Sequence, residues 1–162
     1  MGAWGHKALE SDEGLDVVDF IRDYVSSNYP NNEPVNLTLS ELINLMKADG
    51  FFGETFEEID FYFDHSAMAL AELFLMFKNT GQLKYEDEED ESMNLKKRVK
   101  SFSGDKKSFE FLLQYLMDIK NEVPDADGER EIVELWKDSD VYQEWNENLN
   151  DLIKQINQIK NS

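Results

Sequence analysis

Apolar residues recur every three or four positions along most of the chain, which is the period of amphipathic helices. Strict alternation of apolar and polar residues, typical of strands, is scarce. The pattern predicts helices over residues 11–26, 38–49, 56–78, 108–120, 131–137 and 142–159. Short extended pieces fit at Phe51-Phe52 or Leu83-Lys84-Tyr85. We therefore expect an all-α fold, a single-domain bundle of about six helices.

The stretch Phe56–Lys78 is the most apolar part of the chain and predicts a buried central helix. A helix that is apolar on nearly every face has to be surrounded by other elements. Titratable residues interrupt it, among them Asp60, Asp64, His65 and Glu72. No uncharged run in it approaches the roughly 20 residues that a bilayer requires, so we do not expect a membrane span.

Several helix boundaries carry clear signals. Ser11 is a candidate N-cap, and Thr38 with Glu41 forms a capping box before the second helix. Gly81 gives the central helix a glycine stop. Two prolines and the Asn31-Asn32 pair indicate a loop after the first helix.

The three tryptophans, Trp4, Trp136 and Trp145, are expected to be structural residues. Trp4 stands between small residues, so the backbone can turn while the indole docks on the core. Trp145 belongs to an apolar stripe over residues 142–159 with alternating spacings of three and four. The stripe is shorter than the three to four heptads that favour a coiled coil. We therefore expect it to dock on the chain's own helices, in a monomer, rather than to dimerise.

The charge balance is far from neutral, with 35 acidic against 16 basic residues and a formal net charge of −19. Because Lys and Arg supply the attraction to phosphate backbones, nucleic acid is not an expected partner. A charge of this sign favours a basic protein partner, or simply solubility.

The chain of 162 residues contains no cysteine, which excludes disulfides, cysteine-ligated zinc, iron–sulfur clusters and thiol catalysis. This composition fits a reducing compartment, and no signal-peptide pattern is visible, so we expect a cytoplasmic location. The Met1-Gly2 start does not predict myristoylation, because His6 stands where Ser or Thr is required.

Six consecutive acids form the one low-complexity run: Glu86, Asp87, Glu88, Glu89, Asp90 and Glu91. They predict a mobile acidic loop at about residues 84–93 and are the candidate binding residues. Six basic residues follow within residues 96–107 and can neutralise the acids. This pairing makes the basic cluster a poor nucleic-acid site.

The opening string GAWGHKALESDEGLDVVDFI contains Gly-x-Trp-Gly and then Asp-x-x-Leu-Asp. It resembles the start of an uncharacterised bacterial family, a domain of unknown function. The segments AELFLMFKNTG, KSFSGDKKSFEFLLQYL and EREIVELWKDSD are similar to longer members of that family. The resemblance covers most of the chain and implies a bacterial origin, and it brings no active site with it.

Part of a calcium loop is visible in Asp125, Asp127 and Glu134, which fall at ligand positions three, five and twelve. Val123 occupies the first ligand position, and Arg130 stands where an apolar residue is expected. An ordinary turn and helix start is therefore favoured over a metal site.

The remaining titratable residues do not form a recognisable catalytic motif. His65 has no metal-binding neighbour at helical spacing, so it is interpreted as a core histidine with a hydrogen-bonded partner. Asp60, Asp64 and Glu72 suggest a carboxylate site, but two of them sit early in a helix, where the dipole tolerates them. No cofactor is expected.

No phosphate loop, nucleophile elbow, paired-histidine motif or dinucleotide fingerprint occurs in the sequence. We therefore expect a non-enzymatic, immunity- or inhibitor-like binding protein that acts on a basic protein. Three alternatives remain open: a DNA-mimicking regulator, a small enzyme with a carboxylate-lined pocket, and a protein whose acidic surface serves only solubility. Charge geometry separates them. Mimicry needs rows of carboxylates, inhibition needs an acidic patch around an apolar anchor, and an enzyme needs acids that converge in a cleft.

Overall fold

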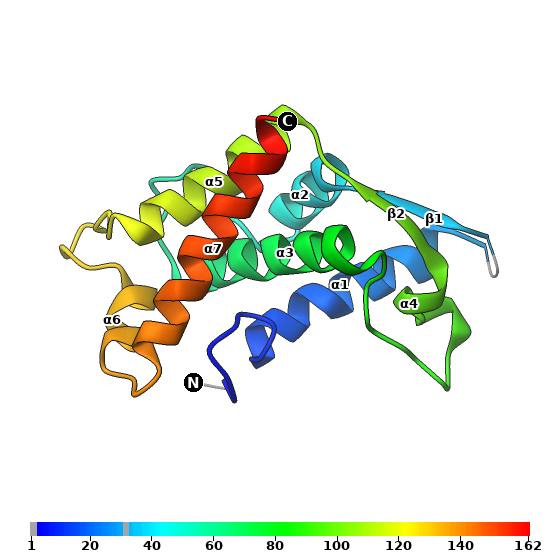
Figure 1. Ribbon diagram of the computed structural model, residues 1–162, viewed down its shortest axis with the longest axis horizontal. Helices are drawn as coiled ribbons and strands as arrows, with labels where there is room; N and C mark the ends of the chain where they lie inside the picture. The colour runs from blue at the N-terminus through cyan, green and yellow to red at the C-terminus, as the bar shows by residue number, and fades with distance from the viewer. Residues whose placement is uncertain (1–2, 31–32) are drawn as a thin grey trace.

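Helix α3 (Phe61–Thr80) is the element on which the rest of the chain packs, as Figure 1 shows. The computed structural model describes residues 3–30 and 33–162. Every residue of α3 from Asp64 to Leu75 is buried. The prediction of a buried central helix is therefore confirmed.

The start of α3 differs from the prediction, which placed it at Phe56. Asp60 has an extended backbone, and its side chain accepts a hydrogen bond from the Tyr62 N–H at 2.8 Å, so Asp60 is the N-cap. Residue Phe56 lies before the helix and packs its ring against Phe111, with the centroids 5.2 Å apart. At the other end Gly81 has a φ of 78°, the left-handed conformation that the predicted glycine stop requires.

Helices from both ends of the chain cover α3 (Figure 1). They are α1 (Asp12–Asn28), α5 (Lys106–Lys120), α6 (Glu131–Lys137) and α7 (Tyr142–Lys160). Helix α7 crosses α3 and packs along α5, and α2 (Leu39–Ala48) packs against α5. The described residues contain seven α-helices, because a one-turn helix, α4 (Leu95–Arg98), joins the six predicted ones. The all-α fold class is therefore confirmed.

The apolar stripe of α7 faces the inside of the molecule. Its buried residues are Trp145, Leu149, Leu152, Ile153 and Ile156. They lie on the helix that contacts α3 and α5, so the stripe docks on the chain's own helices as predicted. Trp136 of α6 stacks on Trp145 with the ring centroids 5.9 Å apart. Both indoles are buried in the core, and the expectation of a monomer stays a prediction.

Two short strands were not predicted. β1 (Val35–Thr38) and β2 (Val99–Ser103) pair in parallel, and a 3-10 turn, η1 (Glu91–Met93), precedes α4 and β2. The pairing joins segments that are far apart in the chain, and each strand is too short to give a periodicity signal. The extended pieces expected at Phe51-Phe52 and Leu83-Lys84-Tyr85 are not strands.

The prediction that Trp4 docks on the core is wrong, because its side chain is 61% exposed. The N-terminal segment closes on itself instead. The Trp4 N–H donates to the Glu10 carbonyl at 2.9 Å, and Ala3 forms a bridge with Ser11. Ala8, which is 3% exposed, is the residue of this segment that enters the core.

Two sequence features lie outside the described residues, namely the Met1-Gly2 start and the Asn31-Asn32 pair of the predicted loop. Within residues 3–30 and 33–162, no helix combines the length and the apolar character that crossing a bilayer demands.

Candidate functional site

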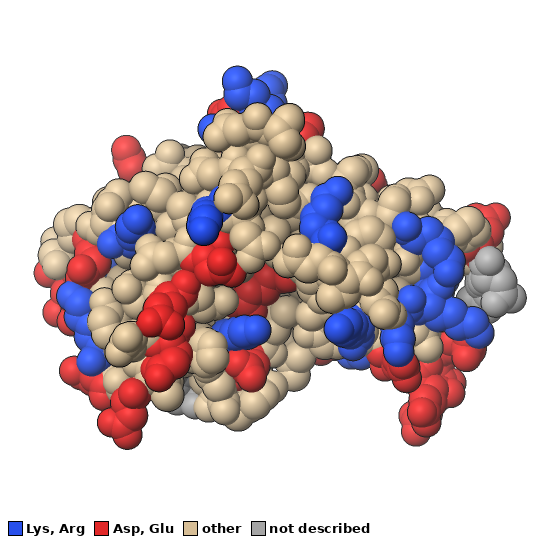
Figure 2. All heavy atoms as spheres, in the orientation of Figure 1, with Lys and Arg blue, Asp and Glu red and all other residues tan. Residues whose placement is uncertain are grey.

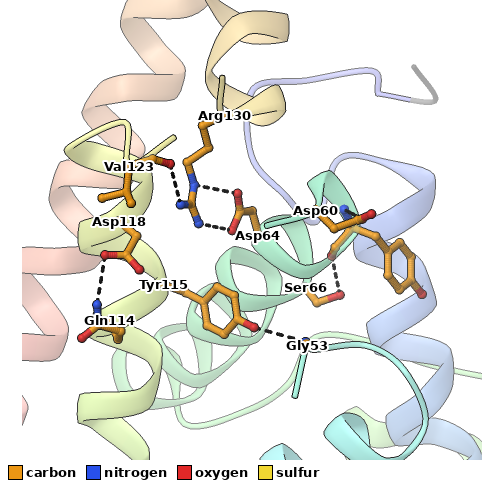
Figure 3. A network of polar contacts seen from close by, with 10 residues as sticks. Gly53, Asp60, Asp64, Ser66, Gln114, Tyr115, Asp118, Val123 and Arg130 are labelled. Atoms are coloured by element: carbon orange, nitrogen blue, oxygen red, sulfur yellow. Dashed lines mark hydrogen bonds and ion pairs between the residues drawn. The ribbon is translucent and has the colours of Figure 1, made fainter. Parts of the chain in front are cut away.

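A buried ion pair joins α3 to the loop before α6 (Figure 3). Arg130 Nη2 lies 2.6 Å from Asp64 Oδ1, and Arg130 Nε donates to Asp64 Oδ2 at 2.9 Å. Both side chains are 1% exposed. Arg130 Nη1 also donates to the Val123 carbonyl at 3.1 Å. The guanidinium therefore fixes both ends of the loop between α5 and α6 to the central helix.

Burial raises the pKa of Asp64 to about 6. The hydrogen bonds and the charge of Arg130 act in the opposite direction, while the negative charges of Asp118 and Asp60 raise the pKa further. Desolvation is the largest of these effects because the carboxylate has almost no contact with solvent. Two hydrogen bonds therefore hold the ionised pair together, while the burial of both charges costs solvation free energy.

The pKa of Asp64 predicts how stability depends on pH. The folded pKa of about 6 exceeds the ordinary value of 3.8, so the stability contributed by this group is fully present below about pH 3.8 and is lost as the pH rises through about 6. Lowering the pH from 7.5 to 5 should add about 1 kcal/mol to the free energy of unfolding through Asp64. Urea denaturation at both pH values measures it.

The matched control is Asp60→Asn, which removes the same charge one turn away while keeping an N-cap side chain. Asp64→Asn should lose this part of the pH dependence, whereas Asp60→Asn should keep most of it, because Asp60 has the smallest of these effects on the Asp64 pKa. Equal pH dependence in wild type and Asp64→Asn would show that Asp64 does not titrate in this range.

His65 of α3 binds the start of α1. Its Nε2 lies 2.8 Å from Ser11 Oγ and 3.2 Å from the Ala8 carbonyl, and Ser11 Oγ donates to the same carbonyl at 2.6 Å. Ser11 also caps α1 by accepting from the Gly14 N–H at 3.0 Å, as predicted. Burial lowers the pKa of His65. The interpretation of His65 as a core histidine with a hydrogen-bonded partner agrees with this geometry.

Glu72 holds the N-terminal segment and α7 to the middle of α3. Its Oε2 accepts from the Ala8 N–H at 2.8 Å and from Asn148 Nδ2 at 3.0 Å, and its Oε1 accepts from the Leu9 N–H at 2.9 Å. Burial raises the pKa of Glu72, and these hydrogen bonds act against the rise. Eight positions along a helix place Glu72 about 12 Å from Asp64. The two carboxylates therefore do not form one site.

A cleft of about 530 Å³ opens beside Glu72. Its walls come from residues 7–10, the second half of α3, residues 84–85 and α7. Charged residues of both signs line it: Lys7, Glu10, Glu72, Lys84 and Asp151. Acidic and basic side chains are interspersed on the face shown in Figure 2. Three acids therefore line this cleft together with two lysines.

A groove of about 540 Å³ runs between α1 and α2. The acids that line it are Asp23, Glu41 and Asp49, and no Lys or Arg is among its lining residues. Its apolar part includes Phe20 and Leu45, and the Leu45 side chain is 37% exposed. The Tyr24 hydroxyl donates to Glu41 Oε1 at 2.7 Å. Burial raises the pKa of Tyr24, and this hydrogen bond raises it further. The groove is an acidic patch around an apolar centre.

The acidic run at residues 86–91 is largely engaged by its own neighbourhood. Lys96 Nζ lies 2.8 Å from Glu86 Oε1, and Lys97 Nζ lies 2.9 Å from Glu91 Oε2. Asp87 Oδ1 accepts from the backbone N–H groups of Glu89 and Asp90, and Asp90 caps η1. Glu88 and Glu89 are exposed. The local neutralisation agrees with the sequence interpretation, and the mobility of the loop stays a prediction.

The calcium-loop residues adopt a turn. Asp125 Oδ1 accepts from the Asp127 N–H at 2.8 Å and from the Glu129 N–H at 3.1 Å, and Gly128 has a φ of 81°. Asp127 and Glu134 are exposed. Across the described ranges no three His, Asp or Glu side chains gather as a metal site. This segment therefore forms a turn followed by the start of α6.

The sequence pattern does not predict the role of Arg130. Arg130 does depart from the calcium pattern, and in the structure it is the ion-pair partner of Asp64. Arg98, assigned to the basic cluster, is likewise 5% exposed and donates to the carbonyls of Ser92 and Pro30. The sequence neighbours of both arginines are largely charged, so no local signal predicts that either side chain is buried.

A family model described as a domain of unknown function (DUF4259) matches residues 2–148. The chain belongs to this family. No curated protein and no solved structure matches it. The DUF4259 match confirms the resemblance seen in the opening string, and the bacterial origin and the opening motif stay predictions. The matched range ends within α7, so it includes the whole α1–α2 groove and most of the Glu72 cleft.

Proposed function

We propose that this protein is a non-enzymatic acidic binding protein that occupies a basic surface on another protein, in an inhibitor- or immunity-like role. The observation that supports it is the groove between α1 and α2, where three acids surround an exposed leucine. The proposal places the protein in a bacterial cytoplasm as a monomer, and the absence of cysteine is compatible with that compartment.

The net charge gives the first argument. A magnitude of roughly 2–8 is enough for the solubility of a small domain, and this chain carries −19. Such a surplus costs stability through self-repulsion. Steering toward a positively charged partner is a functional gain that can offset this cost, because complementary charges accelerate encounter and exclude wrong partners.

The groove has acids that are free to meet a partner. Among the described residues, Asp23, Glu41 and Asp49 have no Lys, Arg or His nitrogen within 4.0 Å, whereas Glu86 and Glu91 of the acidic run are ion-paired. A partner cation in the groove replaces water rather than an internal cation. Two of the six acids of the run are ion-paired, and the run contains no apolar residue, so we prefer the groove as the contact surface.

The apolar part of the groove indicates the chemistry of the partner surface. Leu45 is exposed and Phe20 is half-buried, with its ring 5.2 Å from that of Phe51. Binding energy at interfaces concentrates in a few central, desolvated contacts surrounded by polar ones. We expect the partner to place an apolar or aromatic side chain over Leu45 and Lys or Arg residues against the three acids.

A DNA-mimicking role is the second candidate, and one row of acids on α1 favours it. Asp12, Asp16, Asp19 and Asp23 are all exposed and follow each other at spacings of three and four residues. At a rise of 1.5 Å per residue the row is about 16 Å long. Asp19 is paired with Arg22 at 3.3 Å, which interrupts the row. The inhibitor role is therefore preferred, and both roles require a basic partner.

The test is affinity capture from a lysate of the source organism at low salt and then at high salt. A basic protein should be retained at low salt and released at high salt, because exposed charges are screened. The triple variant Asp23→Asn, Glu41→Gln, Asp49→Asn should lose most of the retained protein. Quantitative mass spectrometry of the eluates measures the retention.

A triple variant with the same charge change elsewhere is the control. Glu57→Gln, Glu88→Gln, Glu89→Gln changes three exposed acids outside the groove and should keep the partner. Equal losses of the retained protein in both triple variants would mean that net charge, and not the groove, is responsible for binding the partner. An equal loss in Asp12→Asn, Asp16→Asn would favour mimicry. If no basic partner is retained, the proposal is wrong.

A further inference from the structure

The cleft beside Glu72 carries a second and independent inference. We propose that it binds a small zwitterion with an apolar body, the chemistry of a free amino acid or a short peptide. The cleft volume of about 530 Å³ lies within the range of roughly 300–1,000 Å³ that small-molecule sites occupy. The cleft is separate from the α1–α2 groove, because the two share no lining residue.

The first argument is that unpaired charges of both signs line one cavity. Lys7 and Lys84 are exposed at its rim, as is Asp151, and Glu10 is half-buried. In the part of the chain that the structure describes, none of the four has an oppositely charged atom within 4.0 Å. A ligand that carries only a positive charge is repelled by the two lysines. A ligand that carries only a negative charge is repelled by the carboxylates. A zwitterion satisfies both.

The second argument is the fixed polar group in the lining. Glu72 is 8% exposed and held by three hydrogen bonds, so its position is set before a ligand arrives. Oε2 accepts two of these bonds and Oε1 accepts one. Because each carboxylate oxygen can accept about two hydrogen bonds, one acceptor position on Oε1 remains for a ligand N–H. A fixed acceptor of this kind orients an ammonium group.

The third argument is the apolar lining between the charges. Leu9, Leu75, Met76 and Leu152 line the same cleft. Leu75 and Leu152 are each 3% exposed and belong to the core, whereas Leu9 and Met76 are half-buried. Apolar linings with a few placed polar groups are the usual construction of ligand sites. The ligand should therefore carry an aliphatic side chain.

The experiment is an NMR titration of the full chain with L-leucine and with L-leucyl-L-leucine, followed through amide shifts of residues 7–10 and 148–155. At least one probe should give saturable shifts there. Isoamylamine and 4-methylpentanoate, which keep only the ammonium or only the carboxylate of leucine, should bind about tenfold more weakly or worse, since a charged hydrogen bond is lost. The two zwitterions distinguish a free amino acid from a peptide.

Rim variants keep the test independent of folding. Asp151→Asn and Lys84→Met change exposed side chains and should each weaken binding of the zwitterion about tenfold. Glu57→Gln and Lys47→Met, which change exposed side chains away from the cleft, should leave it unchanged. No saturable shift with either zwitterion overturns the proposal. Binding of either single-charge analogue as tight as that of leucine also overturns it.

Discussion

Replacing Arg130 with methionine should lower the free energy of unfolding at pH 7.5 by about 3–5 kcal/mol. The substitution leaves the Asp64 carboxylate, 1% exposed, without its counter-ion in the core. It also removes the hydrogen bond from Arg130 Nη1 to the Val123 carbonyl. Breaking one side of a buried pair is costly because the remaining carboxyl group has neither water nor its partner and must either stay as an unsolvated charge or take up a proton. Urea denaturation followed by circular dichroism measures the change.

Two further variants separate the lost pair from lost packing. Asp64→Leu combined with Arg130→Met removes both charges and should recover much of the loss, since apolar replacements of buried pairs are often close to neutral. Lys106→Met breaks the pair with Glu110, in which the lysine side chain is 78% exposed, and should change stability by less than about 1 kcal/mol. A loss in Arg130→Met no larger than that in Lys106→Met would contradict the structural role of the pair.

Replacing Gly14 with alanine should lower the free energy of unfolding by about 3 kcal/mol, the upper part of the range for overpacked sites. Helix propensity alone predicts the opposite, a gain of about 1 kcal/mol. A Cβ at Gly14 would lie 1.9 Å from the Ala8 carbonyl oxygen. That carbonyl cannot move freely, because Ser11 Oγ donates to it and the Ala8 N–H donates to Glu72. Thermal and urea denaturation measure the change.

Ser27→Ala is the control for Gly14→Ala, since Ser27 is an exposed position of the same helix. It should be neutral or slightly stabilising, because alanine is the better helix former. If Gly14→Ala were also stabilising, the contact between the N-terminal segment and α1 would differ from the one described. A shift of the His65 ring resonances in Gly14→Ala would localise the damage to this contact, because His65 Nε2 lies 3.2 Å from the same carbonyl.

Sequence patterns predicted one of the acidic candidate surfaces but not the other two. The acidic run was the visible candidate, because six adjacent acids need no fold to be noticed. The groove acids Asp23, Glu41 and Asp49 come from two helices and the residue after the second, and only the tertiary structure brings them into one groove with Leu45. The cleft acids Glu10, Glu72 and Asp151 are equally dispersed in the chain.

Local chemistry determined most of the helices. The N-cap at Ser11, the cap at Thr38 and the glycine stop at Gly81 were all predicted, because each depends on hydrogen bonds within a few residues. The burial of α3 was also predicted, since an apolar helix has to be surrounded. The sequence by itself therefore determined the all-α class, the central helix and the inward stripe of α7.

Tertiary structure decided what depends on partners distant in the chain. Strands β1 and β2 exist only as a pair, Trp4 stays exposed while Ala8 of the same segment enters the core, and the buried position of Arg130 depends on Asp64. Periodicity reports which face of a helix is apolar, but it does not report which helix lies opposite. The physical reason is that a buried charge or a cavity is a property of several segments at once, whereas a cap or a stripe is a property of one.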